Sequence, residues 1–103
     1  MNTPEPGFYY HYKHDLNGTV DNFAYEVIAT GTHTESLETL VVYRSLYTTE
    51  TQGGSHYWIR PLEMFMGTIE KNGKTFPRFI QITDAHTISE LTAIRDRMYS
   101  KDK

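Results

Sequence analysis

Two stretches of the sequence combine residue types that could carry acid–base or binding chemistry. In the first, His33-Thr34-Glu35 precedes a run of strand formers, and Glu38 follows three residues later. Histidine titrates closest to neutral pH, and a neighbouring carboxylate can orient its ring. His33 with Glu35 or Glu38 could therefore act as an acid–base pair. Because T-x-x-E sequences also cap short helical turns, the same residues could instead form a structural corner.

In the second stretch, WIRPLEMF, Trp58 and Arg60 stand two residues apart. On a strand this spacing puts both side chains on one face, where an indole ring and a guanidinium suit a planar or anionic ligand. The alternative is that Trp58 belongs to the core and Arg60 pairs with Glu63 or Glu38. The spacing alone leaves both interpretations open.

The segment GFYYHYK, residues 7–13, offers a third candidate surface. Alternation along a strand sends three of its polar or aromatic side chains to one face, and neighbouring strands could extend that face. The residues of this surface would be Tyr9, His11, Lys13, Tyr43 and Arg78. Small barrels use such grooves for peptides or nucleic acid, and a solvated strand face is the alternative.

The motifs of metal, phosphate-loop and serine-nucleophile sites are missing from the sequence. His11 and His14 would point to opposite faces of a strand, and neither H-x-H nor H-E-x-x-H occurs. Gly53-Gly54 lacks the lysine and helix of a phosphate-binding loop, and no G-x-S-x-G occurs. The chain has no cysteine, which excludes disulfides and thiolate ligands. We therefore expect no metal and no cofactor, and favour a non-catalytic protein over an enzyme.

Length and charge restrict the class of protein further. The chain has 103 residues, which suits one domain, and a formal net charge of −3. That charge lacks the basic surplus of a general nucleic-acid binder. No apolar run approaches the ~20 residues that cross a bilayer, and the N-terminus has no signal-peptide pattern. We expect a cytoplasmic protein without general nucleic-acid or membrane binding, monomeric or weakly self-associating.

Alternating patterns predict the strands that must position these candidates. We expect strands over residues 7–13, 23–30, 39–47, 55–60, 67–71 and 74–82. Asn72-Gly73 predicts a tight hairpin turn, and Pro77 indicates an edge strand or a bulge.

The end of the chain changes to helical spacing. A T-x-x-E capping-box sequence begins at Thr87, and Leu91, Ile94 and Met98 then recur on one face. We expect one amphipathic helix over residues 87–99, packed on the strands.

Four ordered segments give the sequence a resemblance to a known family. They are Gly7-x-Tyr9-x-His11-Tyr12-Lys13, His33-Thr34-Glu35-x-x-Glu38, Val41-Val42-Tyr43-x-x-Leu46-Tyr47 and Trp58-Ile59-Arg60-Pro61-x-x-Met64-Phe65. With Pro77-Arg78-Phe79 as the closing piece, the chain resembles the bacterial domain of unknown function 1653 over residues 7–79. The resemblance implies a small SH3-like barrel and brings no established activity. The family usually has glycine after the lysine, where this chain has His14.

Pattern and resemblance together predict an all-β, mainly β fold. We expect a small SH3-like β-barrel of five to seven short strands with one C-terminal α-helix. Residues 1–6 would form a flexible lead-in, residues 7–82 the barrel, and residues 83–103 a linker and the helix.

The predicted function is that of a small, non-catalytic binding module whose ligand, a small molecule or a peptide, lies at one end of the barrel. Because neighbouring strands usually pair, the strands over 39–47 and 55–60 should bring Arg60 near the His33 corner. The expected site residues are Tyr9, His11, Lys13, His33, Glu35, Tyr43, Trp58, Arg60 and Arg78. The alternatives are a small enzyme that uses His33 with Glu35 or Glu38, and a protein–protein interaction domain.

Overall fold

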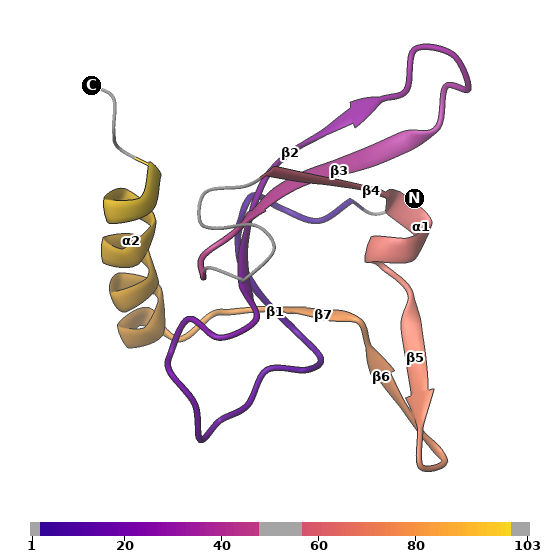
Figure 1. Cartoon of the computed structure of the whole chain (residues 1–103). Helices are drawn as coiled ribbons and strands as arrows, with labels where there is room; N and C mark the ends of the chain where they lie inside the picture. Colours follow the sequence, from indigo (N-terminus) through magenta and orange to yellow (C-terminus); the bar gives the residue numbers. More distant parts are fainter. Residues whose placement is uncertain (1–2, 48–56, 100–103) are drawn as a thin grey trace.

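A computed structural model describes residues 3–47 and 57–99 of the chain (Figure 1). Five antiparallel strands form the main sheet in the order β4-β3-β2-β1-β7, and β5 pairs with β6 in a separate hairpin. The strands are β1 (Gly7–His11), β2 (Ala24–Thr32), β3 (Thr39–Ser45), β4 (Tyr57–Pro61), β5 (Thr68–Lys71), β6 (Lys74–Pro77) and β7 (Phe79–Gln81). The helices are α1 (Leu62–Phe65) and α2 (Ala85–Tyr99). The predicted strand residues 55–56, the Gly53-Gly54 pair and residues 1–2 and 100–103 lie outside the described residues.

The mainly β class that the sequence predicted is confirmed, whereas a closed barrel is not observed. In the described ranges β4 and β7 are the two edges of the five-stranded sheet and do not pair with each other. Figure 1 shows α2 on one side of this sheet, and α1 with the β5–β6 hairpin on the other. The sheet is therefore covered by different elements on its two faces.

The face under α2, called here the helix face, holds one of two hydrophobic cores. Its buried side chains are Phe8, Ala24, Leu46 and Leu91. Leu91 comes from α2 and is fully buried, and Ile88 and Ile94 flank it at helical spacing. The terminal helix thus packs on the sheet.

The opposite face, called here the aromatic face, holds the second core. Its buried residues are Tyr9, Val27, Val41, Tyr43, Leu62, Phe65 and Phe79. Phe65 stacks on Phe79 with ring centroids 4.2 Å apart, and Tyr43 meets Phe79 edge-on at 5.7 Å. Phe8 and Tyr9 belong to different cores, as alternation along the first strand predicted.

The single helical turn α1 was not predicted from the sequence. It follows Pro61 directly and buries Leu62 and Phe65, which stand three residues apart and so share one side of a helix. Glu63 lies in its first turn, where a carboxylate is favourable. This turn positions the Phe65 ring in the core of the aromatic face.

The strand predicted over residues 74–82 is divided in two at Arg78. Pro77 ends β6, and the backbone of Arg78 then joins two elements, because its N–H donates to Gly67 O (3.0 Å) and its carbonyl accepts from Tyr12 N–H (2.9 Å). The edge or bulge that Pro77 indicated is therefore a strand break. Arg78 stands where the β5–β6 hairpin meets the main sheet.

Two local predictions, the turn at Asn72-Gly73 and the start of the last helix, can be compared with the structure. Asn72 and Gly73 both have positive φ, 55° and 77°, as the predicted Asn–Gly hairpin turn requires. The start of the last helix was wrong by two residues. Asp84 caps α2, since its carboxylate accepts from Thr87 N–H (2.9 Å) and from the Thr87 hydroxyl (2.8 Å). These hydrogen bonds lower the pKa of Asp84.

Candidate functional site

Polar side chains from β1 and β4 lie close to the ring of Phe79 on the aromatic face. His11 of β1 is the register partner of Phe79, and their ring centroids lie 5.1 Å apart. The Arg60 guanidinium of β4 lies 5.6 Å from the centre of the same ring. Arg78 precedes Phe79 in the chain, and Lys13 lies two residues beyond His11. We call His11, Lys13, Arg60 and Arg78 the basic cluster.

His11 enters the cluster as a neutral hydrogen-bond donor. Its Nδ1 accepts the Lys13 backbone N–H at 3.2 Å, so the proton of the neutral ring belongs on Nε2. Burial and, to a smaller extent, the positive charges of Arg60, Lys13 and Arg78 together lower the pKa of His11 to about 4. The ring is therefore uncharged at neutral pH and presents an Nε2–H donor.

Arg60 is held in place by a buried tyrosine. Its Nε donates to Tyr43 Oη at 2.9 Å, and Tyr43 is only 3% exposed. The sequence allowed an ion pair with Glu63 or Glu38, but the ion pairs found in residues 3–47 and 57–99 do not include Arg60. This bond fixes the position of the guanidinium and leaves its remaining N–H groups to other partners.

The other two cations of the cluster also lack an acidic partner. Arg78 Nε is buried and has no hydrogen-bond partner within the described part of the chain. Lys13 is exposed, with its Nζ 6.0 Å from the centre of the Tyr12 ring. Neither side chain forms an ion pair with any residue that the structure describes. Within residues 3–47 and 57–99, three positive charges therefore act on one histidine without a compensating carboxylate.

Half-buried aromatic rings border the cluster at the β1–β2 end. Phe23 lies 5.9 Å from His11 and 5.6 Å from Tyr47, measured between ring centroids. The hydroxyls of Tyr25 and Tyr47 share a hydrogen bond. Burial raises the pKa of both tyrosines, so both hydroxyls stay protonated. The rings supply an apolar wall with neutral polar tips.

These bordering residues were not predicted as site residues. Tyr25 follows Phe23 at a spacing of two, and β2 is the strand that pairs with β1, so alternation could have brought them to the His11 face. Phe23 itself has a φ of 53°, a left-handed conformation that is rare for a bulky residue and has no sequence signature.

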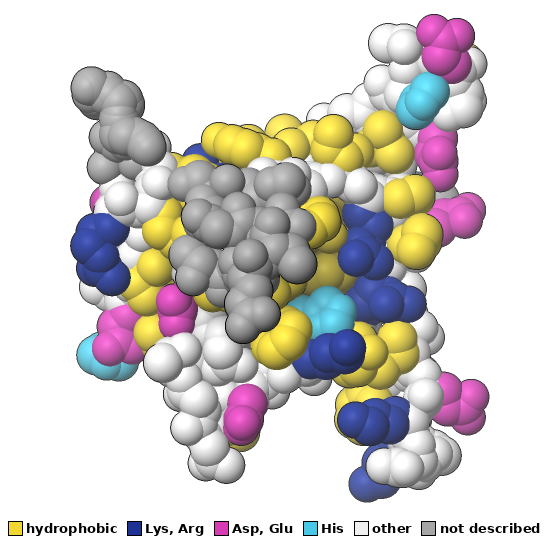
Figure 2. Space-filling model, viewed as in Figure 1, with side chains coloured by type: hydrophobic (Ala, Val, Ile, Leu, Met, Phe, Trp, Pro, Cys, Tyr) yellow, Lys and Arg dark blue, Asp and Glu magenta, His cyan; other side chains and the backbone are white. Residues whose placement is uncertain are grey.

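Figure 2 shows one face of the molecular surface on which Lys and Arg side chains lie next to a histidine, with hydrophobic side chains beside them. The acidic side chains visible in this view lie mostly toward the margins of the molecule.

The His33 corner does not join this cluster. Val41 pairs with Arg60, which confirms the predicted strand neighbours, but the β2–β3 hairpin continues past the end of β4 to the Thr32–Thr39 pair. His33 and Glu35 lie in its exposed tip, at the end of the long hairpin in Figure 1. No contact of theirs with the basic cluster is found among the described residues.

The imidazole of His33 instead stabilises its own turn. Its Nδ1 accepts the backbone N–H groups of Glu35 (3.0 Å) and Ser36 (3.1 Å). Leu37 in the same turn has a φ of 63° and is 73% exposed. The corner thus has the structural role that was one of the two interpretations, with the histidine rather than a threonine as the capping residue.

Two other predicted site residues belong mainly to the core. Tyr9 is 6% exposed and donates its hydroxyl to Glu5 O at 2.9 Å. Trp58 is partly buried and packs against the aromatic core opposite Tyr43. Trp58 and Arg60 share a face of β4, as their spacing predicted, and Trp58 packs against the core of that face.

Comparison with known proteins identifies the family. The family model described as "Protein of unknown function (DUF1653)" matches residues 7–81. The chain belongs to DUF1653. A crystal structure of a DUF1653 protein from Bordetella bronchiseptica is similar, with a TM-score of 0.61 and 27% sequence identity over 79% of this chain and 90% of that one. No curated protein matches the chain.

Membership of DUF1653 supplies a fold and no established activity, so the function must be inferred from the site. The matched region contains every residue of the basic cluster, whereas α2 begins after its end. No helix within the described residues is long and apolar enough to span a bilayer, and no group of three or more metal-ligating side chains is found there.

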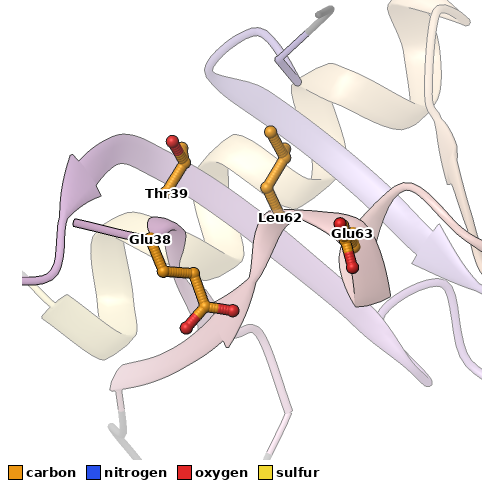
Figure 3. A pocket seen from close by; sticks show the side chains of 4 residues that line it. All are labelled: Glu38, Thr39, Leu62 and Glu63. Atoms are coloured by element: carbon orange, nitrogen blue, oxygen red, sulfur yellow. The ribbon is translucent and has the colours of Figure 1, made fainter. Parts of the chain in front are cut away.

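Two hollows of this DUF1653 chain lie beside α1 rather than at the cluster's centre. The smaller, of ≈ 220 Å³, is lined by Glu38 and Thr39 at the start of β3 and by Leu62 and Glu63 of α1 (Figure 3). The larger, of ≈ 500 Å³, is lined by residues of the N-terminal segment and by Tyr9, Phe65 and Phe79, and none of its lining residues belongs to the basic cluster. The acidic lining of the smaller hollow would repel an anion.

Proposed function

We propose that this DUF1653 chain is a non-catalytic binding module that takes an anionic ligand at the basic cluster. One observation carries the proposal: Lys13, Arg60 and Arg78 act together on His11 and have no acidic partner among the described residues, in a chain of net charge −3. Positive charges held close to one another repel, and a bound anion removes that repulsion.

The polar groups of the cluster also favour an anion by their hydrogen-bonding character. A guanidinium and an ammonium can only donate, and the neutral His11 ring has its Nδ1 occupied and its Nε2–H available. The partner must therefore supply acceptors. A carboxylate, phosphate or sulfate does so, and arginine binds such groups through two parallel N–H groups.

The same groups argue against catalysis at this site. An imidazole whose pKa is about 4 is a weak base at neutral pH, so His11 is poorly suited to removing a proton. The neighbouring hydroxyls of Tyr25 and Tyr47 have raised pKa values and are not activated as nucleophiles. The cluster is better suited to holding an anion than to transforming one.

Calorimetric titration at low ionic strength with inorganic phosphate, sulfate and citrate tests the proposal. We expect saturable binding by the unaltered protein and a loss of about tenfold or more in affinity in Arg60→Gln and in Arg78→Gln, because each removes charge-assisted hydrogen bonds. The control is Arg97→Gln, which changes the net charge equally on an exposed position of α2.

Two outcomes would contradict the proposal. In one, none of the three anions binds saturably. In the other, Arg97→Gln weakens binding as much as the cluster variants, which would mean that the anion responds to total charge and not to this site.

A further inference from the structure

The ring of Phe23 stands beside the basic cluster on a backbone that disfavours it. Its φ of 53° lies in the left-handed region, which glycine adopts freely and a bulky side chain rarely does. The position is nevertheless occupied by an aromatic residue whose ring is only half buried and approaches both His11 and Tyr47. An unfavourable conformation that puts a ring at the edge of a candidate site suggests a use for that ring.

The number of positive charges in the cluster indicates which kind of anion fits it best. Lys13, Arg60 and Arg78 contribute three positive charges, and His11 contributes a donor without charge. A single carboxylate would leave two of these charges uncompensated. A phosphate monoester carries nearly two negative charges at neutral pH and three acceptor oxygens, so it matches the cluster more closely.

The rings next to the cluster indicate what the phosphate is attached to. Phe23 and Tyr47 are half buried, whereas Tyr43 and Phe79 are buried in the core and cannot receive a ligand ring. Aromatic rings that keep part of their surface accessible beside a positively charged site are typical of proteins on which nucleic-acid bases stack.

We propose that the ligand is a phosphate monoester carried on a planar ring, such as a nucleoside monophosphate or the phosphorylated end of a single strand, with Phe23 contacting the ring and Arg60 and Arg78 binding the phosphate. This inference rests on the proposed function, because it names the chemical class of the anion. It adds a second recognition element that inorganic anions do not use.

Calorimetric titration with adenosine 5′-monophosphate and ribose 5-phosphate tests the two elements separately. The two probes share the phosphate and differ in the base. In the unaltered protein we expect the nucleotide to bind about tenfold more tightly, the gain that stacking of one base provides. Arg60→Gln should weaken the binding of both probes by about tenfold.

Variants at Phe23 distinguish ring contact from a structural role. In Phe23→Gly we expect the two probes to bind equally, with the affinity for ribose 5-phosphate unchanged and the melting temperature changed little, since relief of the positive φ offsets part of the lost ring contacts. The matched control Phe23→Tyr keeps a ring and should keep the tenfold preference. If Phe23→Gly instead weakens both probes equally, the ring supports the fold and the inference is wrong.

The failures of the two proposals can be told apart. Equal affinity of both probes in the unaltered protein, with both still dependent on Arg60, overturns the planar-ring inference and keeps the anion site. Binding of inorganic phosphate but of neither probe overturns the planar-ring inference alone, whereas binding of neither probe nor of any inorganic anion overturns both proposals. A 5′-phosphorylated dinucleotide then identifies the source of the ligand: tighter binding than the mononucleotide supports a strand end, and weaker binding supports a free nucleotide.

Discussion

The two faces of the main sheet use arginine in different ways. On the helix face, the carboxylate of Glu26 lies between two arginines, with Arg44 Nη2 and Arg95 Nη1 each 2.8 Å from one of its oxygens. On the aromatic face, Arg60 donates to a tyrosine hydroxyl and Arg78 Nε has no acceptor within the described residues. The first arrangement pairs its charges within the fold, whereas the second, in the part of the chain that the structure describes, holds its arginines without an acidic partner.

The aromatic surroundings of the arginines do not account for this difference. Arg44 lies 4.1 Å from the centre of the Tyr99 ring, and Arg60 lies 5.6 Å from that of Phe79. Both guanidinium groups thus rest near aromatic rings, and a ring alone cannot neutralise a charge. What distinguishes the faces among the described residues is the carboxylate, which pairs with arginines on the helix face and is not found beside Arg60 or Arg78.

The largest expected effect comes from truncating one buried side chain of the helix-face core. Leu91 is fully buried between α2 and the sheet, so Leu91→Ala should lower the free energy of unfolding by about 3 kcal/mol through lost burial and the remaining cavity. Urea unfolding measures this change. The affinity for inorganic phosphate should stay unchanged in the folded variant, because the cluster lies on the other face. A parallel loss of affinity would show that the two faces are coupled.

The second test replaces one charged side chain on each face of the sheet by neutral glutamine. Glu26→Gln removes the carboxylate that Arg44 and Arg95 share, and Arg95 keeps its ion pair with Asp96. We expect the variant to cost about 2 kcal/mol of stability, less than for a fully buried pair because the Glu26 side chain is 13% exposed. Arg60→Gln should change stability by less than about 0.5 kcal/mol and act on anion binding instead. Equal stability losses in urea unfolding would contradict the distinction between the faces.

The third test concerns pH and the histidine of the cluster. The pKa of His11 falls from an unfolded value near 6.5 to about 4 because of burial and the neighbouring cations Arg60, Lys13 and Arg78. As the pH falls through this window the unfolded chain takes up the proton first, so stability that is present above pH ~6.5 is lost toward pH ~4. Since the ring is only half buried, we expect a loss of roughly 1–2 kcal/mol.

The variant His11→Gln isolates this contribution. Glutamine can still accept the Lys13 N–H but does not titrate, so the difference in unfolding free energy between protein and variant should shrink between pH 7 and pH 4.5. The carboxylates and Tyr25 are common to both proteins and cancel. Parallel stability curves over this range would show that His11 is not desolvated.

Periodicity predicted the parts of this molecule that depend on local rules. Alternation separated Phe8 from Tyr9, and the Asn72-Gly73 sequence predicted a turn whose two residues have positive φ. The sequence predicted the basic cluster only in part. His11, Arg60 and Arg78 were expected in one site, but the aromatic residues that border them were not.

The remaining features depend on tertiary contacts that no local pattern encodes. The turn α1 is too short to show a helical period and forms where Leu62 and Phe65 can be buried. Pro77 predicted an irregularity but not that Arg78 would bridge two sheets. His33 was wrongly expected beside Arg60 because the sequence predicts which strands pair but not how far each hairpin extends. The β2–β3 hairpin continues past the end of β4 and carries His33 away from the cluster.

The smallest expected effect belongs to this hairpin tip. In His33→Ala, the exposed amides of Glu35 and Ser36 lose the imidazole acceptor and turn to water, so we expect stability to fall by only about 0.5 kcal/mol. The affinities for phosphate and for adenosine 5′-monophosphate should equal those of the unaltered protein. His33→Asn is the matched control, because a side-chain oxygen can accept the same amides and should restore the stability. A drop in affinity as large as that of Arg60→Gln, with stability unchanged, would return His33 to the ligand site and place recognition at both ends of the aromatic face.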